Sequence, residues 1–139
     1  MLGDLIWEAK GKMTGIRVLG SDAQGTKMEQ SWAGTGQGKG ALAGVDGNET
    51  GTAISVWRPD GIVEAEGQLL TMTIQGDAVV VKAKGLTLPT GPTRLSGRGM
   101  VTFWSASPKL SWLNKTVGIY EVEIDQATQE YTTRVWQWK

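Results

Sequence analysis

The sequence of 139 residues contains no cysteine and no histidine. These absences exclude disulfides, thiol nucleophiles, histidine bases, the usual catalytic triads and the common zinc ligands. Any chemistry must therefore come from carboxylates, lysine, arginine, tyrosine or hydroxyl groups. We expect neither a metal nor a cofactor.

The chain also lacks an excess of charge and any long apolar run. It has 14 Lys and Arg against 14 Asp and Glu, so neither nucleic acid nor an anionic membrane surface is an expected partner. No segment approaches the roughly 18 apolar residues of a spanning helix. Asp4 and Glu8 interrupt what would have to be the apolar core of an export signal. We expect a soluble, cytoplasmic protein with a single domain over residues 1–139.

Glycine, in contrast, is abundant, and it occupies every second position from Gly34 to Gly40 in WAGTGQGKG. The stretch is not a phosphate-binding loop, because Ala33 replaces the first glycine of that motif and Gly40 replaces its hydroxyl residue. The dinucleotide fingerprint fails as well, at Ala41. In an extended strand, alternate residues share one face. We predict that these glycines make room inside a barrel for large rings of neighbouring strands, or let the strand coil tightly.

Alternating polar and apolar residues, broken by short turns, indicate an all-β meander. The expected strands span residues 5–19, 26–40, 49–58, 61–75, 78–88, 93–105, 117–125 and 130–138. The connections between them are short and suit tight reversals, whereas parallel pairing would need long crossovers. The sequence therefore predicts an eight-stranded antiparallel up-and-down barrel.

One short helix is expected near residues 108–113, in SPKLSWLN. Ser107 can cap it, Pro108 suits its first position, and Asn114 can end it in a left-handed conformation. Its expected role is to close one end of the barrel with Leu110 and Leu113.

On two of the expected strands, the residue pattern does not decide which face points into the barrel. On the strand at 61–75, Glu64, Glu66 and Gln68 alternate with small and apolar residues, so the pattern does not decide which set faces inward. On the strand at 93–105, Arg98 shares a face with Met100 and Trp104. One interpretation is a polar cluster inside the barrel, where burial raises a carboxylate pKa and a nearby arginine opposes the rise. The other is a solvated outer face, because Glu and Arg are seldom fully buried.

Two other features bear on the interior. Arg17 shares a face with Trp7 and Met13, so we expect it to point inward or to lie near a barrel mouth, with a partner. The chain has seven tryptophans and a single phenylalanine. These rings either fill the core or line a pocket for an apolar ligand, or they form the apolar patch of an oligomer interface.

Four stretches carry a resemblance that covers nearly the whole chain: GKMTGIRVL, RPDGIVEAEGQ, SASPKLSWLN and the ending RVWQWK. In them the chain resembles a family of small uncharacterised prokaryotic β-barrel proteins. The architecture of that family is similar to the allene oxide cyclase-like and lipocalin-like barrels. The resemblance implies the barrel and brings no catalytic residue with it.

The leading hypothesis is that the barrel binds a small, largely apolar or amphipathic molecule, oriented by Arg98 with Glu66 or Gln68. The candidate ligand-binding residues are Trp32, Arg58, Glu64, Gln68, Met100 and Trp104. An alternative is a cofactor-independent isomerase, cyclase or hydrolase, with Glu66 as acid or base and Arg98 or Tyr120 stabilising an oxyanion. A third is a filled barrel that serves as an assembly module, and a homo-oligomer is left open.

Overall fold

The computed structural model describes residues 1–139 and contains eight strands and two short 3₁₀ helices. The elements are β1 (Leu2–Asp22), β2 (Gly25–Gly38), η1 (Gly40–Leu42), β3 (Asp46–Trp57), β4 (Val63–Thr73), β5 (Ala78–Pro89), β6 (Arg94–Trp104), η2 (Pro108–Lys115), β7 (Val117–Asp125) and β8 (Glu130–Trp138). The expected strand boundaries lie within three residues of these. The prediction of an all-β fold is confirmed.

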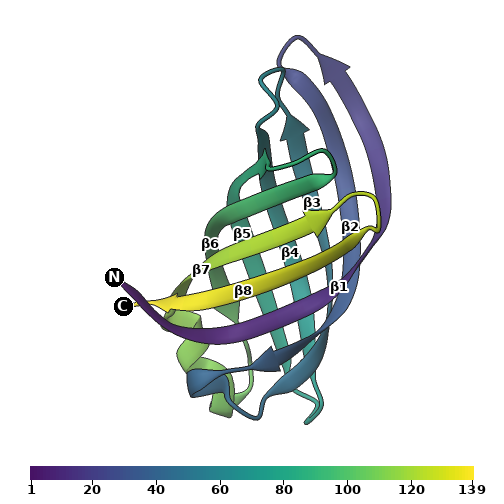
Figure 1. Cartoon of the computed structure of the whole chain (residues 1–139). Coiled ribbons are helices and arrows are strands. Elements are labelled where there is room, and N and C mark those ends of the chain that lie inside the picture. The colour runs from purple at the N-terminus through teal and green to yellow at the C-terminus, as the bar shows by residue number, and fades with distance from the viewer.

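The strands form one closed antiparallel barrel in which each strand pairs with its neighbour in sequence (Figure 1). Closure comes from β1, which pairs with β2 along one edge and with β8 along the other. Opposite β8, for example, Gly11 faces Tyr131 and Trp7 faces Val135. Because β1 and β8 are paired, both chain termini emerge side by side at the same end of the barrel.

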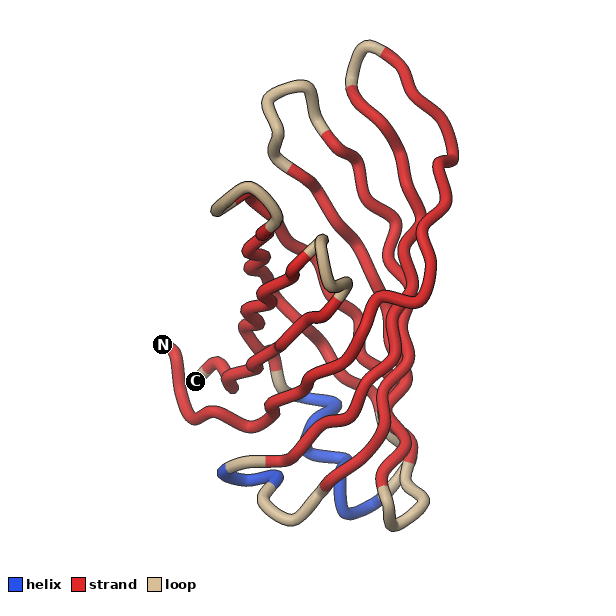
Figure 2. Tube along the Cα trace, turned by 45° about the vertical axis from the view of Figure 1, so that its right-hand side comes forward, coloured by secondary structure: helices blue, strands red, loops and turns tan.

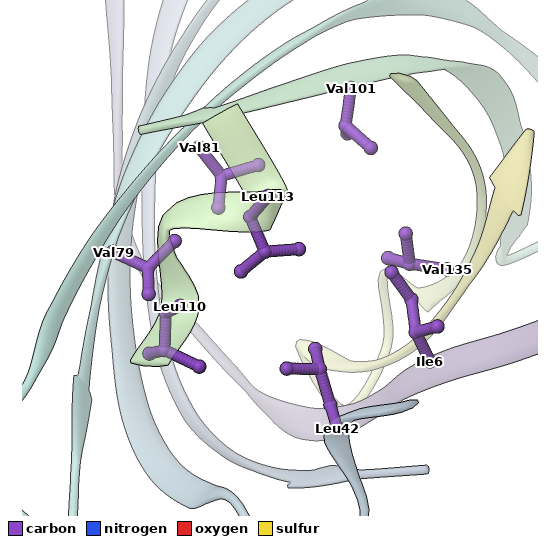
Figure 3. Packing of buried hydrophobic residues seen from close by; sticks show 8 residues of the cluster. All are labelled: Ile6, Leu42, Val79, Val81, Val101, Leu110, Leu113 and Val135. Carbon is purple, nitrogen blue, oxygen red and sulfur yellow. The ribbon is translucent and has the colours of Figure 1, made fainter. Parts of the chain in front are cut away.

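Both helices lie at that end of the barrel (Figure 2), so the opposite end carries only hairpin turns. Leu110 and Leu113 of η2 and Leu42 of η1 are buried in the main apolar cluster. In Figure 3 these leucines point toward the barrel axis and meet valines and an isoleucine of the surrounding strands. The expected role of the helix as a plug is confirmed. No helix in the chain has the length and apolar character needed to cross a membrane.

The ends of η2 differ from the expectation. Ser107 makes no capping hydrogen bond, and its hydroxyl is buried without a partner. Asn114 does not end the helix in a left-handed conformation. Instead, its side-chain amide accepts a hydrogen bond from the Ser105 backbone N–H at 2.7 Å and donates one to the Ser105 carbonyl at 3.0 Å. The helix is thus anchored to the end of β6 by a side chain rather than closed by a backbone turn.

Small and apolar residues, rather than charged ones, face the interior on β4 and β6. On β4 the inward side chains include Ala65 and Leu69, while Glu64, Glu66 and Gln68 are exposed. On β6, the inward set includes two glycines, Val101 and Phe103, and the outward set is Arg94, Ser96, Arg98, Met100, Thr102 and Trp104. The structure therefore decides the faces that the sequence pattern left open.

Two of the alternating glycines of β2 lie beneath aromatic rings from other strands. A side chain at Gly36 would overlap the indole of Trp7 from β1, and one at Gly34 would overlap the hydroxyl of Tyr131 from β8. The prediction that this glycine face makes room for neighbouring rings is confirmed. The same pairing of ring and glycine recurs with Trp32 above Gly51.

The hairpin formed by the end of β1 and the start of β2 projects beyond the rest of the barrel (Figure 1). Pairing of β1 with β8 stops at Lys12, and the rest of β1 pairs with β2 alone. Arg17 lies on this hairpin with 69% of its side chain exposed and contacts Glu29 at 3.3 Å. Of the two positions expected for Arg17, the inward one is wrong, because a bulge between Met13 and Gly15 shifts the register before Arg17 is reached. Arg17 lies instead on the hairpin beyond the barrel mouth, and Glu29 is the expected partner.

We predict that Gly36→Ala destabilises the barrel by about 1–3 kcal/mol, the usual cost of overpacking a core. The added methyl group overlaps the ring of Trp7, which is fixed by a hydrogen bond to Glu49. Gly20→Ala is the matched control, because nothing lies within 4 Å of a methyl group at Gly20. Urea unfolding followed by tryptophan fluorescence measures both variants. Equal midpoints for Gly36→Ala and the wild type would show that the ring does not depend on this glycine.

Candidate functional site

The barrel encloses a cavity of about 180 Å³ lined by 28 residues, of which 21 are hydrophobic. Several lining residues at mid-barrel are small, including Ala53, Ala65, Gly67 and Ala83. Eight-stranded barrels can be filled by side chains or can hold one small ligand. In this barrel the small residues leave the space unfilled.

Aromatic side chains cover much of the cavity wall. The lining includes Trp7, Trp32, Phe103, Tyr120 and Tyr131. Four of these rings rest against wall glycines: Trp7 on Gly36, Tyr131 on Gly34, Trp32 on Gly51 and Gly67, and Tyr120 on Gly85 and Gly99. Because the glycines have no side chains, the rings can lie close to the wall and leave the centre open.

The cavity wall contains one carboxylate, that of Glu49 on β3, which is only 4% exposed. One of its oxygens, Oε1, accepts a hydrogen bond from the indole Nε1 of Trp7 at 3.1 Å. The other, Oε2, accepts one from the Tyr131 hydroxyl at 2.8 Å. Both donors reach Glu49 across β2, over Gly36 and Gly34. The glycine run of β2 thus leaves room for a polar site formed by residues of β1, β3 and β8.

Burial dominates the electrostatics of this site. Desolvation raises the pKa of Glu49, and the hydrogen bonds from Tyr131 and Trp7 oppose that rise in part. The pKa of Tyr131 is also raised, first by burial and then by the neighbouring Glu49 charge and hydrogen bond. Burial alone raises the pKa of Tyr120. Both tyrosines therefore stay protonated at neutral pH, and Glu49 is the titrating group of the cavity.

A second polar cluster lies farther along β3, toward the end without helices. The Ser55 hydroxyl donates a hydrogen bond to Oε1 of Gln30 at 3.0 Å, and it accepts one from the indole of Trp57 at 3.1 Å. Gln30 lines the cavity. The cavity therefore has neutral hydrogen-bonding groups toward one end and a carboxylate deeper inside.

Two of the residues predicted from sequence line the cavity, namely Trp32 and Tyr120. The others do not. Glu66 forms an exposed ion pair with Lys84 at 3.0 Å. Arg58 contacts Asp60 at 2.6 Å and Glu64 at 3.8 Å, again at the surface.

The remaining predicted residues are also on the outer face. Gln68 and Arg98 are exposed, and Met100 and Trp104 are 46% and 60% exposed. The expectation that Glu64, Glu66 and Gln68 face Arg98 across an interior cavity is therefore wrong. Glu64 and Glu66 instead border a shallow outer depression with Lys84 and Leu86.

Sequence reasoning missed Glu49 because the search for an interior polar cluster was confined to β4 and β6, whose inward faces it left undecided. In the structure the interior carboxylate lies on β3, on a face of small residues beneath rings of other strands. A signal was present, since Glu49 lies two residues from Gly47 and Gly51 and therefore shares their face. Once the face of β3 that carries these glycines is known to be internal, Glu49 must also point into the barrel.

The structure has no group of three or more acidic, histidine or cysteine side chains that could hold a metal ion. Glu49 is the one charged side chain among the residues that line the cavity. The chemistry available to the site is hydrogen bonding, ion pairing and proton transfer at one carboxylate.

We predict that the stability of the wild type falls relative to Glu49→Gln as pH rises above about 4.5, the ordinary value for a glutamate. The folded protein holds the proton more tightly than the unfolded chain, so ionisation of Glu49 costs folding free energy. Each unit of difference between folded and unfolded pKa is worth about 1.4 kcal/mol. Urea unfolding of both proteins from pH 4 to pH 8 measures the difference. A constant difference across that range would mean that Glu49 titrates normally.

Comparisons with known proteins bear on the fold alone. No protein-family model matches the chain, and no curated protein matches it in sequence. A conserved protein of unknown function from Rhodopseudomonas palustris has a similar structure, with a TM-score of 0.82 at 17% identity over 99% of this chain and 97% of that one. A β-barrel-like protein from Acinetobacter baumannii matches with a TM-score of 0.82 at 18% identity, covering 100% and 96%. An enzyme from Penicillium herquei matches with a TM-score of 0.68 at 18% identity, covering 96% and 92%. The chain thus has the fold of small β-barrel proteins.

Proposed function

We propose that the protein binds a small, largely apolar molecule inside its barrel. The observation that carries the proposal is the interior cavity, which is lined mainly by hydrophobic side chains. Pockets of this composition, with a few placed polar groups, are typical of small-molecule sites. An empty apolar cavity also lowers stability, because its lining loses packing contacts. A ligand would restore those contacts.

The volume limits the size of the ligand. In another protein, an engineered apolar cavity of about 150 Å³ binds benzene. The cavity of about 180 Å³ described above is therefore suited to one ring with a short substituent. A long lipid chain would need the wall to move.

The polar groups set the orientation of the ligand. Glu49 lies deep in the wall with Tyr131, while the Tyr120 hydroxyl forms no hydrogen bond within the protein and can bind a ligand. The outward position of Arg98 and Glu66 removes them from this role. The ligand is oriented by Glu49 and the tyrosines.

A second candidate function is acid–base catalysis without a cofactor, as in an isomerase, cyclase or hydrolase. The observation that favours it is a buried carboxylate with a raised pKa at the wall of a cavity, an arrangement common to general acids and bases. One protein of similar fold, from Penicillium herquei, is described as an enzyme. In this hypothesis Glu49 replaces Glu66 as the acid or base, and Tyr120 keeps its proposed role as an oxyanion donor.

We predict that the wild type binds toluene or indole and that Ala83→Leu weakens this binding by at least about tenfold, because the larger side chain occupies the cavity. Arg98→Met is the control, since Arg98 is outside the barrel and its loss should leave binding unchanged. Ligand-observed NMR measures binding, and urea unfolding checks that both variants fold. Equal binding by Ala83→Leu and the wild type would place the ligand elsewhere.

For the catalytic candidate, we predict that the protein accelerates the exchange of acetophenone methyl protons with D₂O. Glu49 would remove the proton next to the carbonyl, and loss of such a base typically costs about 10²–10⁴-fold in rate. Proton NMR follows the exchange for the wild type, for Glu49→Gln and for the control Glu66→Gln. Exchange at the buffer rate with all three proteins would leave binding as the supported function.

A further inference from the structure

The cavity contains a carboxylate for which the protein supplies no counter-charge. No lysine or arginine lines the cavity, and the chain has no histidine. None of the ion pairs of the protein includes Glu49. Its hydrogen-bond donors, Trp7 and Tyr131, are both neutral. Buried charges in proteins are normally paired or bound to a metal, so ionisation of Glu49 is favoured when a bound group supplies the opposite charge.

Glu49 also has capacity left to bind a ligand. An ionised carboxylate has about four acceptor sites. Trp7 uses one on Oε1 and Tyr131 uses one on Oε2, and the remaining sites are not used by other protein groups. The two bonds hold the carboxylate in a fixed orientation on the cavity wall. A donor group of a ligand therefore meets a preorganised acceptor.

The surrounding rings favour positive charge as well. Trp7, Trp32, Phe103, Tyr120 and Tyr131 line the same cavity. Aromatic faces attract cations, with tryptophan the most effective, and the attraction is larger away from water. A carboxylate and several rings thus create a negative potential in a space from which the protein's own cations are absent. A carboxylate or phosphate ligand would be repelled by Glu49 and would find no cation to bind.

We propose that the barrel binds a small organic amine in its ammonium form, with the ammonium group on Glu49 and the apolar body among the aromatic rings. This inference rests on the proposed binding function and names its ligand class. Amines of the lysine type remain protonated at neutral pH, because their pKa is about 10.4. Ion pairing would then supply the counter-charge that the wall lacks.

Three probes of similar size and different charge test the proposal: benzylamine, benzyl alcohol and benzoate. At pH 7.5, the wild type should bind benzylamine at least about tenfold more tightly than benzyl alcohol, as expected for a close buried charge pair. Benzoate should not bind detectably. Isothermal calorimetry measures the amine, and ligand-observed NMR measures the weaker probes.

Glu49→Gln keeps the shape of the side chain and removes its charge. We expect this variant to lose the preference for benzylamine and to keep its affinity for benzyl alcohol. Glu66→Gln is the matched control, because it makes the same substitution in an exposed ion pair outside the barrel. It should behave as the wild type does. Retained binding of benzyl alcohol shows that Glu49→Gln is folded.

A pH series gives a second test that needs no variant. The titratable groups that face Glu49 are Tyr131 of β8 and, elsewhere in the lining, Tyr120 of β7, both with raised pKa values. Both tyrosines stay protonated between pH 4 and pH 8, so Glu49 is the group of the cavity lining whose ionisation can change over this range. Affinity for benzylamine should therefore rise with pH over this range, while affinity for benzyl alcohol should stay constant.

The outcomes separate this inference from the function on which it rests. If the wild type binds benzyl alcohol and benzylamine equally, the amine proposal is overturned and the apolar cavity remains a binding site. If Glu49→Gln keeps the full preference for the amine, the ammonium group lies elsewhere and the proposal is again overturned. If neither these probes nor toluene or indole bind, the proposed binding function itself fails.

Discussion

The glycine face of β2 is the constraint on which the closed barrel and its site both depend. Trp7 of β1 and Tyr131 of β8 reach Glu49 of β3 only because Gly36 and Gly34 leave no side chain in between. These hydrogen bonds join residues 42 and 82 positions apart in sequence. They connect β1 and β8, the two strands whose pairing closes the barrel, to β3. The same contacts that fix closure also fix the position of the buried carboxylate.

The interior combines two features that each lower stability. A cavity loses packing contacts, and a desolvated carboxylate loses its hydration. The barrel tolerates both because the plug of Leu42, Leu110 and Leu113 forms a packed apolar cluster at one end. These three leucines also line the cavity, so the packed cluster borders the open space directly. Sites of function are where such departures from an ideal core are expected.

The strand pattern was predictable because short turns and alternation act locally, and the ring-over-glycine packing followed from the parity of Gly34 to Gly40. The inward faces of β4 and β6 were not predictable in the same way. Some of their inner residues are small where rings from other strands occupy the space above them, as Tyr120 does above Gly99 of β6. That information lies in strand pairing between distant residues. For the same reason Glu66 and Arg98 looked internal, although Glu66 pairs with Lys84 in solvent.

Similarity of fold cannot supply the function of this barrel, since the matching structures share only 16–18% identity with it. Most inward residues of this barrel are small or apolar, and Glu49 is the one charged side chain among those that line the cavity. Replacing a buried ionic group with apolar residues of similar volume is often neutral or stabilising. Folding alone therefore does not require a carboxylate at this position. Its fixed orientation by Trp7 and Tyr131, its place in the cavity wall and the absence of a protein cation are the observations that support the proposed ligand site.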